Sequence, residues 1–133
     1  MATFHLQIVI PDRKVFDGEA EKIIVRTVNG DVCILARHID YAAPLGTGEA
    51  IVTDAEGNTR RAACSGGIIS VSGGDVRVMA TTFEWQDEID LDRAEMAKTA
   101  AEQKLHAARR DEADYAMLEA KLKRALVRIQ VKG

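Results

Sequence analysis

The sequence is poor in cysteine, proline and aromatic residues, and it has no long apolar run. Only two cysteines and two prolines occur among its 133 residues, and 5% of the residues are aromatic. Two cysteines without metal-ligand spacing exclude a disulfide scaffold and are typical of a reducing compartment. We expect Cys33 and Cys64 to be buried as small hydrophobic residues. Because no run of about 18 apolar residues occurs, we expect no segment to span a bilayer.

Catalytic groupings are also lacking. The three histidines, His5, His38 and His106, lie in unrelated parts of the chain, and no Ser/His/Asp or Cys/His arrangement is suggested. The sequence therefore predicts no catalytic residue and no metal ligand. The net charge of −3 gives no strong field for nucleic acid. The first five residues lack the layout of a signal peptide, so the chain is expected to stay where it is made.

Residues 1–86 alternate apolar and polar positions with a period near two, which is typical of β-strands. Turn dipeptides such as Asp17–Gly18, Asn29–Gly30 and Gly73–Gly74 separate the apolar runs. The segment 65–67 leads into a strand rather than a helix, so we interpret it as a turn or a close backbone approach and not as a phosphate loop. This half predicts an antiparallel β-sandwich or flattened barrel of eight to ten short strands.

The apolar period changes to about 3.6 at residues 88–94, a segment that we call the junction. We therefore expect two domains, a β-sandwich at 1–86 and a helical hairpin at 87–133, which make an α+β fold. Asp90 is a good N-cap for the first helix, and Asp92 lies in its first turn, where a negative charge is favourable. Residues 109–112 lack periodicity and predict the turn between the helices.

The two predicted helices each have one apolar face and should pack antiparallel. The face of the first helix consists mainly of alanines, whereas the face of the second helix consists mainly of larger apolar side chains. Alanine methyl groups bury little apolar area, so we predict a weakly held hairpin that can open. The two faces are Ala94, Ala97, Ala101, Leu105 and Ala108, and Tyr115, Leu118, Leu122, Ala125, Leu126 and Ile129.

Antiparallel packing would gather Arg93, Arg124 and Arg128 near the open end of the hairpin. Two interpretations stay open on the residue types alone. Arg128 can form exposed ion pairs with Asp90 and Asp92, which would contribute little. Alternatively, the arginines can hold an anion such as a nucleotide phosphate, for which the guanidinium group is well suited. A basic run from 121 to 132 has five cations and no acid.

The order of these features resembles the ε subunit of bacterial F-type ATP synthases, and the likeness covers essentially the whole chain. Residues 89–94, Ile-Asp-Leu-Asp-Arg-Ala, are similar to the I/L-D-x-x-R-A nucleotide motif of that family, and residues 123–128 resemble the second half of its site. Further matching stretches are 29–32, 34–35, His38, 65–68 and Val71.

The resemblance implies a non-catalytic central-stalk subunit that needs no cofactor. Its β domain would bind the γ subunit and the c-ring. Its hairpin would fold down or extend along γ, inhibit ATP hydrolysis and lie near the catalytic α and β subunits, with ATP as a regulatory ligand. The subunit would reach the cytoplasmic face of the bacterial inner membrane only through the complex.

Position by position, the resemblance implies nucleotide contacts from Asp90, Arg93, Arg124 and Arg128, with Glu84 as a weaker match. Ala100 departs from the pattern, because ATP-binding members have an arginine there, and this predicts a weaker site. The loop around Cys33 departs as well: glycine is usual at that position, and prolines are usual at the positions of Ala36 and Asp40.

Two alternatives to this function differ in class. The first is a stand-alone nucleotide sensor whose ligand is its whole purpose. The second is a nucleic-acid-binding hairpin, which would need a broader basic surface than the run at 121–132 provides.

Overall fold

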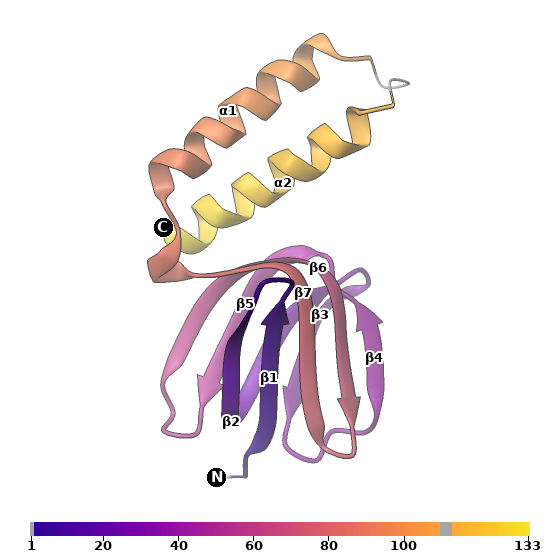
Figure 1. Ribbon diagram of the computed structural model, residues 1–133, viewed down its shortest axis with the longest axis vertical. Helices are drawn as coiled ribbons and strands as arrows, with labels where there is room; N and C mark the ends of the chain where they lie inside the picture. Colours follow the sequence, from indigo (N-terminus) through magenta and orange to yellow (C-terminus); the bar gives the residue numbers. More distant parts are fainter. Residues whose placement is uncertain (1, 110–112) are drawn as a thin grey trace.

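The computed structural model describes residues 2–109 and 113–133, which form a β-barrel with a helical hairpin above it (Figure 1). The predicted turn at 109–112 lies largely outside the described residues. The elements are β1 (Phe4–Ile10), β2 (Arg13–Thr27), β3 (Gly30–Leu35), β4 (Tyr41–Pro44), β5 (Thr47–Asp54), β6 (Thr59–Ser72), β7 (Asp75–Trp85), the 3-10 turn η1 (Gln86–Glu88), α1 (Leu91–Ala107) and α2 (Tyr115–Lys132).

Five strands close on themselves in the order β1-β7-β6-β5-β2, because the long strand β2 also pairs with β1. Strand β3 adds to β2, and β4 adds to β6. The predicted sandwich or flattened barrel is therefore confirmed, with two differences. The β1–β7 pair is parallel. The described strands number seven, because Asp17 and Gly18 do not form a turn but pair with Gln7 and Leu6 inside β2.

The barrel interior is apolar because side chains alternate between its two faces. Along β7, for example, burial alternates residue by residue from Asp75 to Ala80. One continuous core fills the barrel and holds it as a rigid base for the hairpin. Its largest fully buried side chains are Phe83, Leu6, Ile8, Ile23, Ile34, Ile69, Val25, Val52 and Val78.

Gly67 pairs with Ala80 where the backbones of β6 and β7 approach closely, so the interpretation of 65–67 as a close backbone approach is confirmed. Its φ of +94° is unfavourable for other residues. A Cβ at this position would lie 1.8 Å from the carbonyl oxygen of Met79. Glycine is therefore required here by space as well as by conformation.

The two cysteines differ in environment, and the prediction that both are buried is wrong for Cys33. Cys33 is exposed on β3, which is an edge strand with one free side. Cys64 is buried in the barrel, and this burial raises the pKa of its thiol to about 12. Cys33 is thus the reactive thiol of the pair.

A histidine–carboxylate pair joins β1 to β2, and it predicts a pH dependence of barrel stability. His5 Nε2 lies 2.5 Å from Asp17 Oδ1. This bond raises the pKa of His5 and lowers the pKa of Asp17 to about 2. The histidine contribution is complete below pH about 6.5 and is lost as pH rises through the raised pKa, whereas the carboxylate contribution is lost as pH falls toward 2.

We therefore expect the pair to stabilise the barrel most between about pH 4 and 6.5. The melting temperature of His5→Gln, measured beside that of the natural chain, should differ most near pH 5 and converge at pH 9. A difference in melting temperature that increases from pH 5 to pH 9 would contradict this assignment.

Helices α1 and α2 pack side by side and antiparallel above one end of the barrel, so the predicted hairpin is confirmed (Figure 1). The alanine face of α1 is thin: Ala94 and Ala101 are its buried residues, and Ala97 is exposed. On α2 the prediction for Leu126 is wrong, since 44% of this residue is exposed. Neither helix combines the length and hydropathy needed to cross a membrane.

Candidate functional site

The junction caps α1 and fixes its starting direction. The carboxylate of Asp90 accepts a hydrogen bond from the backbone N–H of Arg93 at 3.1 Å, so Asp90 is the N-cap that the sequence predicted. Just before this cap, Glu88 Oε1 accepts a hydrogen bond from the backbone N–H of Trp85 at 3.0 Å. The 3-10 turn η1 therefore connects the last strand of the barrel to the first helix of the hairpin in a defined geometry.

Asp90→Ala should weaken the first turn of α1 by about 1 kcal/mol, because the N–H of Arg93 loses its acceptor. Hydrogen exchange of the amides at 92–95 measures this loss. Asp92→Ala is the matched control, since it removes the same charge from the same turn but not the cap. Equal protection in the two variants would contradict the capping role.

An ion pair joins the hairpin to the barrel. Arg128 Nε, on α2, donates to Glu84 Oε1, on β7, at 2.5 Å, and both side chains are about one-third exposed. Of the two interpretations left open by the sequence, the one in which Arg128 pairs with Asp90 and Asp92 is therefore wrong. The physical reason is that Asp90 turns back to cap its own helix, while the end of β7 carries Glu84 directly beneath α2.

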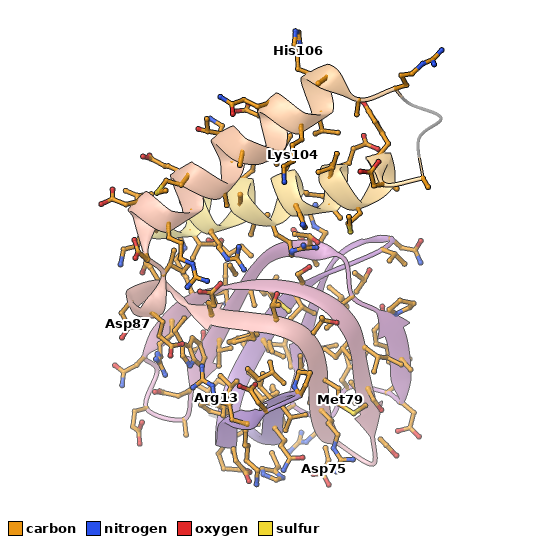
Figure 2. The ribbon with its side chains drawn as sticks, turned by 45° about the horizontal axis from the view of Figure 1, so that its top comes forward. Arg13, Asp75, Met79, Asp87, Lys104 and His106 are labelled. Carbon is orange, nitrogen blue, oxygen red and sulfur yellow. The ribbon has the colours of Figure 1, made fainter. Side chains whose placement is uncertain are left out.

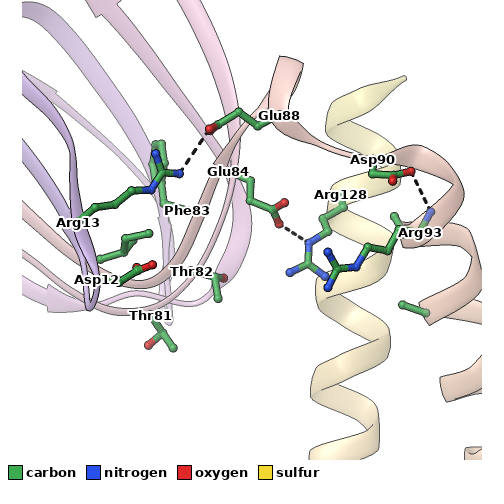
Figure 3. Close-up of a pocket in the computed structure, with 13 residues that line it drawn as sticks. Asp12, Arg13, Thr81, Thr82, Phe83, Glu84, Glu88, Asp90, Arg93 and Arg128 are labelled. Carbon is green, nitrogen blue, oxygen red and sulfur yellow. Dashed lines mark hydrogen bonds and ion pairs between the residues drawn. The ribbon is translucent and has the colours of Figure 1, made fainter.

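A cavity of about 530 Å³, which we call the junction cleft, opens between the barrel, the junction and the two helices. It contains four of the five predicted site residues, all except Arg124 (Figure 3). Its lining is Ile10, Asp12, Arg13, Thr81, Thr82, Phe83, Glu84, Glu88, Asp90, Arg93, Ala94, Ala97 and Arg128.

Figure 3 shows the guanidinium groups of Arg93 and Arg128 beside each other in this cleft. Glu84 pairs with Arg128, and Arg13 reaches Glu88 at 3.4 Å from the far wall. Arg93 has no ion pair among the described residues. Because the guanidinium group of Arg93 has no carboxylate partner among the described residues and Arg128 uses only its Nε toward Glu84, both retain donors that can bind an anion.

Arg124 lies outside the junction cleft but next to it. It lines two smaller cavities that also include Arg128: one between α2 and the barrel, and one between the two helices. Ala100 lines the second of these, where its small side chain leaves space. The structure thus brings Glu84, Asp90, Arg93 and Arg128 together and places Arg124 one helical turn from Arg128 on the same helix.

Sequence analysis missed a second contact between hairpin and barrel, at the last turn of α2. Val131 is fully buried against Ala63 and Ile89. The side-chain amide of Gln86 donates to the carbonyl of Val131 at 2.8 Å, and Lys132 Nζ donates to the carbonyl of Gln86 at 3.1 Å. The signal was present in the sequence, because Val127 and Val131 are four residues apart on a face of α2 separate from the one assigned to the hairpin.

The fold and the cleft define a class of protein: a small β-barrel that carries a C-terminal helical hairpin, with a cleft lined by three arginines and four acids between the two. Family models agree with this description. Residues 3–86 match the model "ATP synthase, Delta/Epsilon chain, beta-sandwich domain", and residues 87–133 match "ATP synthase, Delta/Epsilon chain, long alpha-helix domain".

Relatives and solved structures agree with the family models. The ATP synthase epsilon chain of Caldanaerobacter subterraneus subsp. tengcongensis is 37% identical over 97% of this chain and 93% of its own length. That of Halalkalibacterium halodurans is 37% identical over 100% and 99%. A chain of the Euglena gracilis mitochondrial ATP synthase superposes with a TM-score of 0.80 at 25% identity, covering 92% of this chain and 77% of that one. A chain of the Tetrahymena thermophila mitochondrial ATP synthase central stalk and c-ring, at 12% identity, shows the same fold with a TM-score of 0.68 over 97% and 96%.

The chain therefore belongs to the ATP synthase delta/epsilon family and is a bacterial-type epsilon chain. As such it is a non-catalytic subunit of the central stalk of an F-type ATP synthase.

Proposed function

We propose that this subunit couples rotation of the γ subunit to the c-ring and inhibits ATP hydrolysis through a hairpin that moves between a docked and an extended position. ATP, bound at the junction cleft, acts as a regulatory ligand that favours the docked position. No cofactor is required for the structural role. The subunit would lie at the cytoplasmic face of the bacterial inner membrane as a peripheral part of the complex.

The small size of the docking contact is the observation that carries this proposal. Besides the ion pair of Glu84 with Arg128 and the two hydrogen bonds at Gln86, the apolar contact among the described residues consists of Ala63, Ile89 and Val131, with Val127 packed against them. Burial at about 25 cal/mol per Å² makes three such side chains worth only a few kcal/mol. A contact of this size can be exchanged for another surface of similar strength.

The position of the arginines explains how ATP can favour the docked state. Arg93 is on α1 and Arg128 is on α2, and both line the junction cleft. A phosphate group that binds both guanidinium groups links the two helices to each other beside the barrel. Because the extended hairpin separates these groups, the ligand binds the docked state more tightly and shifts the equilibrium toward it.

The likeness to chains from ATP synthase assemblies supports γ, the c-ring and the catalytic α and β subunits as partners. The basic run at 121–132 supplies the charge expected for contact with acidic segments of the catalytic subunits. Nucleic acid is not an expected partner.

Two measurements test the proposal and separate it from a stand-alone sensor. On a sizing column, the full chain should co-elute with γ, whereas a stand-alone sensor would elute alone. In calorimetry, ATP with Mg²⁺ should bind the natural chain and bind Arg124→Ala more weakly. Arg77→Ala is the control, because Arg77 is exposed on β7 and away from the junction cleft. Equal heats in all three chains would reject Arg124 as a nucleotide contact.

A further inference from the structure

The space between α1 and α2 forms a second cavity, of about 210 Å³, which we call the hairpin groove. Its floor is made of small apolar side chains, and four cations surround it. The lining is Ala97, Ala100, Ala101, Lys104, Leu118, Lys121, Arg124 and Arg128. Since Ala97 and Arg128 also line the junction cleft, the groove adjoins that cleft.

The hairpin groove has an unbalanced charge. No acid is part of its lining, and Lys104, Lys121 and Arg124 form no ion pair within the described part of the chain. Three of the cations, on α2, fall at positions i, i+3 and i+7, so they project from one face of that helix. Cations gathered this closely repel each other, and an anion between them removes the repulsion.

Lys104 supplies the fourth cation from the opposite helix. Figure 2 shows its side chain in the space between α1 and α2. It lies four residues after Ala100, which is slightly more than one helical turn, or roughly 6 Å, further along the same face of α1. Lys121 lines the same groove from α2, so a lysine stands on each side.

We propose that Lys104 and Lys121 bind the distal part of a polyphosphate chain, which runs from the junction cleft past Ala100 into the hairpin groove. This assignment rests on the proposed nucleotide site and extends it by about one helical turn. The alanines at 97, 100 and 101 leave the space for the phosphates, and the two lysines provide charge beyond Ala100. The ligand chemistry is a linear chain of phosphates, carried by a nucleoside triphosphate or free as inorganic tripolyphosphate.

Calorimetry on the full chain tests this with Mg-ATP, Mg-ADP and inorganic tripolyphosphate as separate probes. Lys104→Gln and Lys121→Gln should each weaken ATP and tripolyphosphate binding about three- to tenfold, since each removes one charge-assisted contact. ADP should lose less, because its chain is one phosphate shorter. Lys123→Gln is the matched control: it removes the same charge from the same helix, but Lys123 is exposed and lines no part of the groove.

The outcomes separate this assignment from the proposed function. Lysine variants that bind ATP and tripolyphosphate as tightly as Lys123→Gln would overturn the assignment, and a loss confined to Arg124→Ala would then leave the nucleotide site intact. Tripolyphosphate binding that depends on both lysines, with no ATP binding, would support the groove as a free-polyphosphate site and reject the nucleotide site. A natural chain that binds none of the three probes would reject both.

Discussion

Val131→Asp should release the hairpin from the barrel while the barrel stays folded. Val131 is fully buried in the docked hairpin, where it packs against Ala63 and Ile89, and undocking would return it to solvent. Docking would therefore bury a carboxylate among apolar groups, at a cost of several kcal/mol. Since the docking contact is itself worth only a few kcal/mol, the docked state should be lost.

Hydrogen exchange measures this release directly. The amides of α1 and α2 should lose most of their protection, whereas the amides of β6 and β7 should keep theirs. Leu126→Asp is the matched control on the same helix, since Leu126 is 44% exposed and lies outside the docking contact. Retained helix protection in Val131→Asp would show that the last turn of α2 does not hold the hairpin.

Arg128→Gln should weaken both docking and nucleotide binding. It removes the partner of Glu84, which costs about 1–2 kcal/mol because the pair is hydrogen-bonded but partly exposed. It also removes one of the two guanidinium groups in the junction cleft, so ATP affinity should fall about tenfold or more. Calorimetry measures the affinity, and hydrogen exchange of α2 measures the docking.

Arg128→Lys keeps the charge but not the fork of donors, so it should fall between the natural chain and Arg128→Gln in both measurements. Arg77→Gln on the barrel should match the natural chain. Loss of docking in Arg128→Gln with unchanged ATP affinity would restrict Arg128 to a structural role.

Most of the fold could be predicted from the sequence, because the patterns that indicate its strands, turns and helix cap are local. Alternation along the strands, the dipeptides Asn29–Gly30 and Gly73–Gly74, and the cap at Asp90 each depend on neighbouring residues. Asp17–Gly18 was wrongly predicted to form a turn, because the long pairing of β2 with β1 overrides the local turn preference of this dipeptide. The parallel pairing of β1 with β7 depends on the closure of the barrel, which no local pattern encodes.

The candidate site was only partly readable. Spacing on two helices was enough to bring Arg93 and Arg128 together in one cleft. The spacing did not reveal that Arg128 pairs with Glu84 on β7 rather than with Asp90 and Asp92. That ion pair depends on how the hairpin lies on the barrel. The buried role of Val131 was missed for the same reason: α2 has two partners, and sequence analysis assigned it only one.

The central claim is that ATP holds the hairpin in its docked, closed form, and a distance across the hairpin tests it most directly. Met96 on α1 and Met117 on α2 are exposed and can be replaced by cysteines for spin labels. Cys33→Ser removes the exposed native thiol, and Cys64 is buried. In complex with γ, Mg-ATP should shift the distance distribution toward the single short distance of the closed hairpin, and Arg128→Gln should abolish the shift. A distribution that saturating Mg-ATP leaves unchanged would contradict the account.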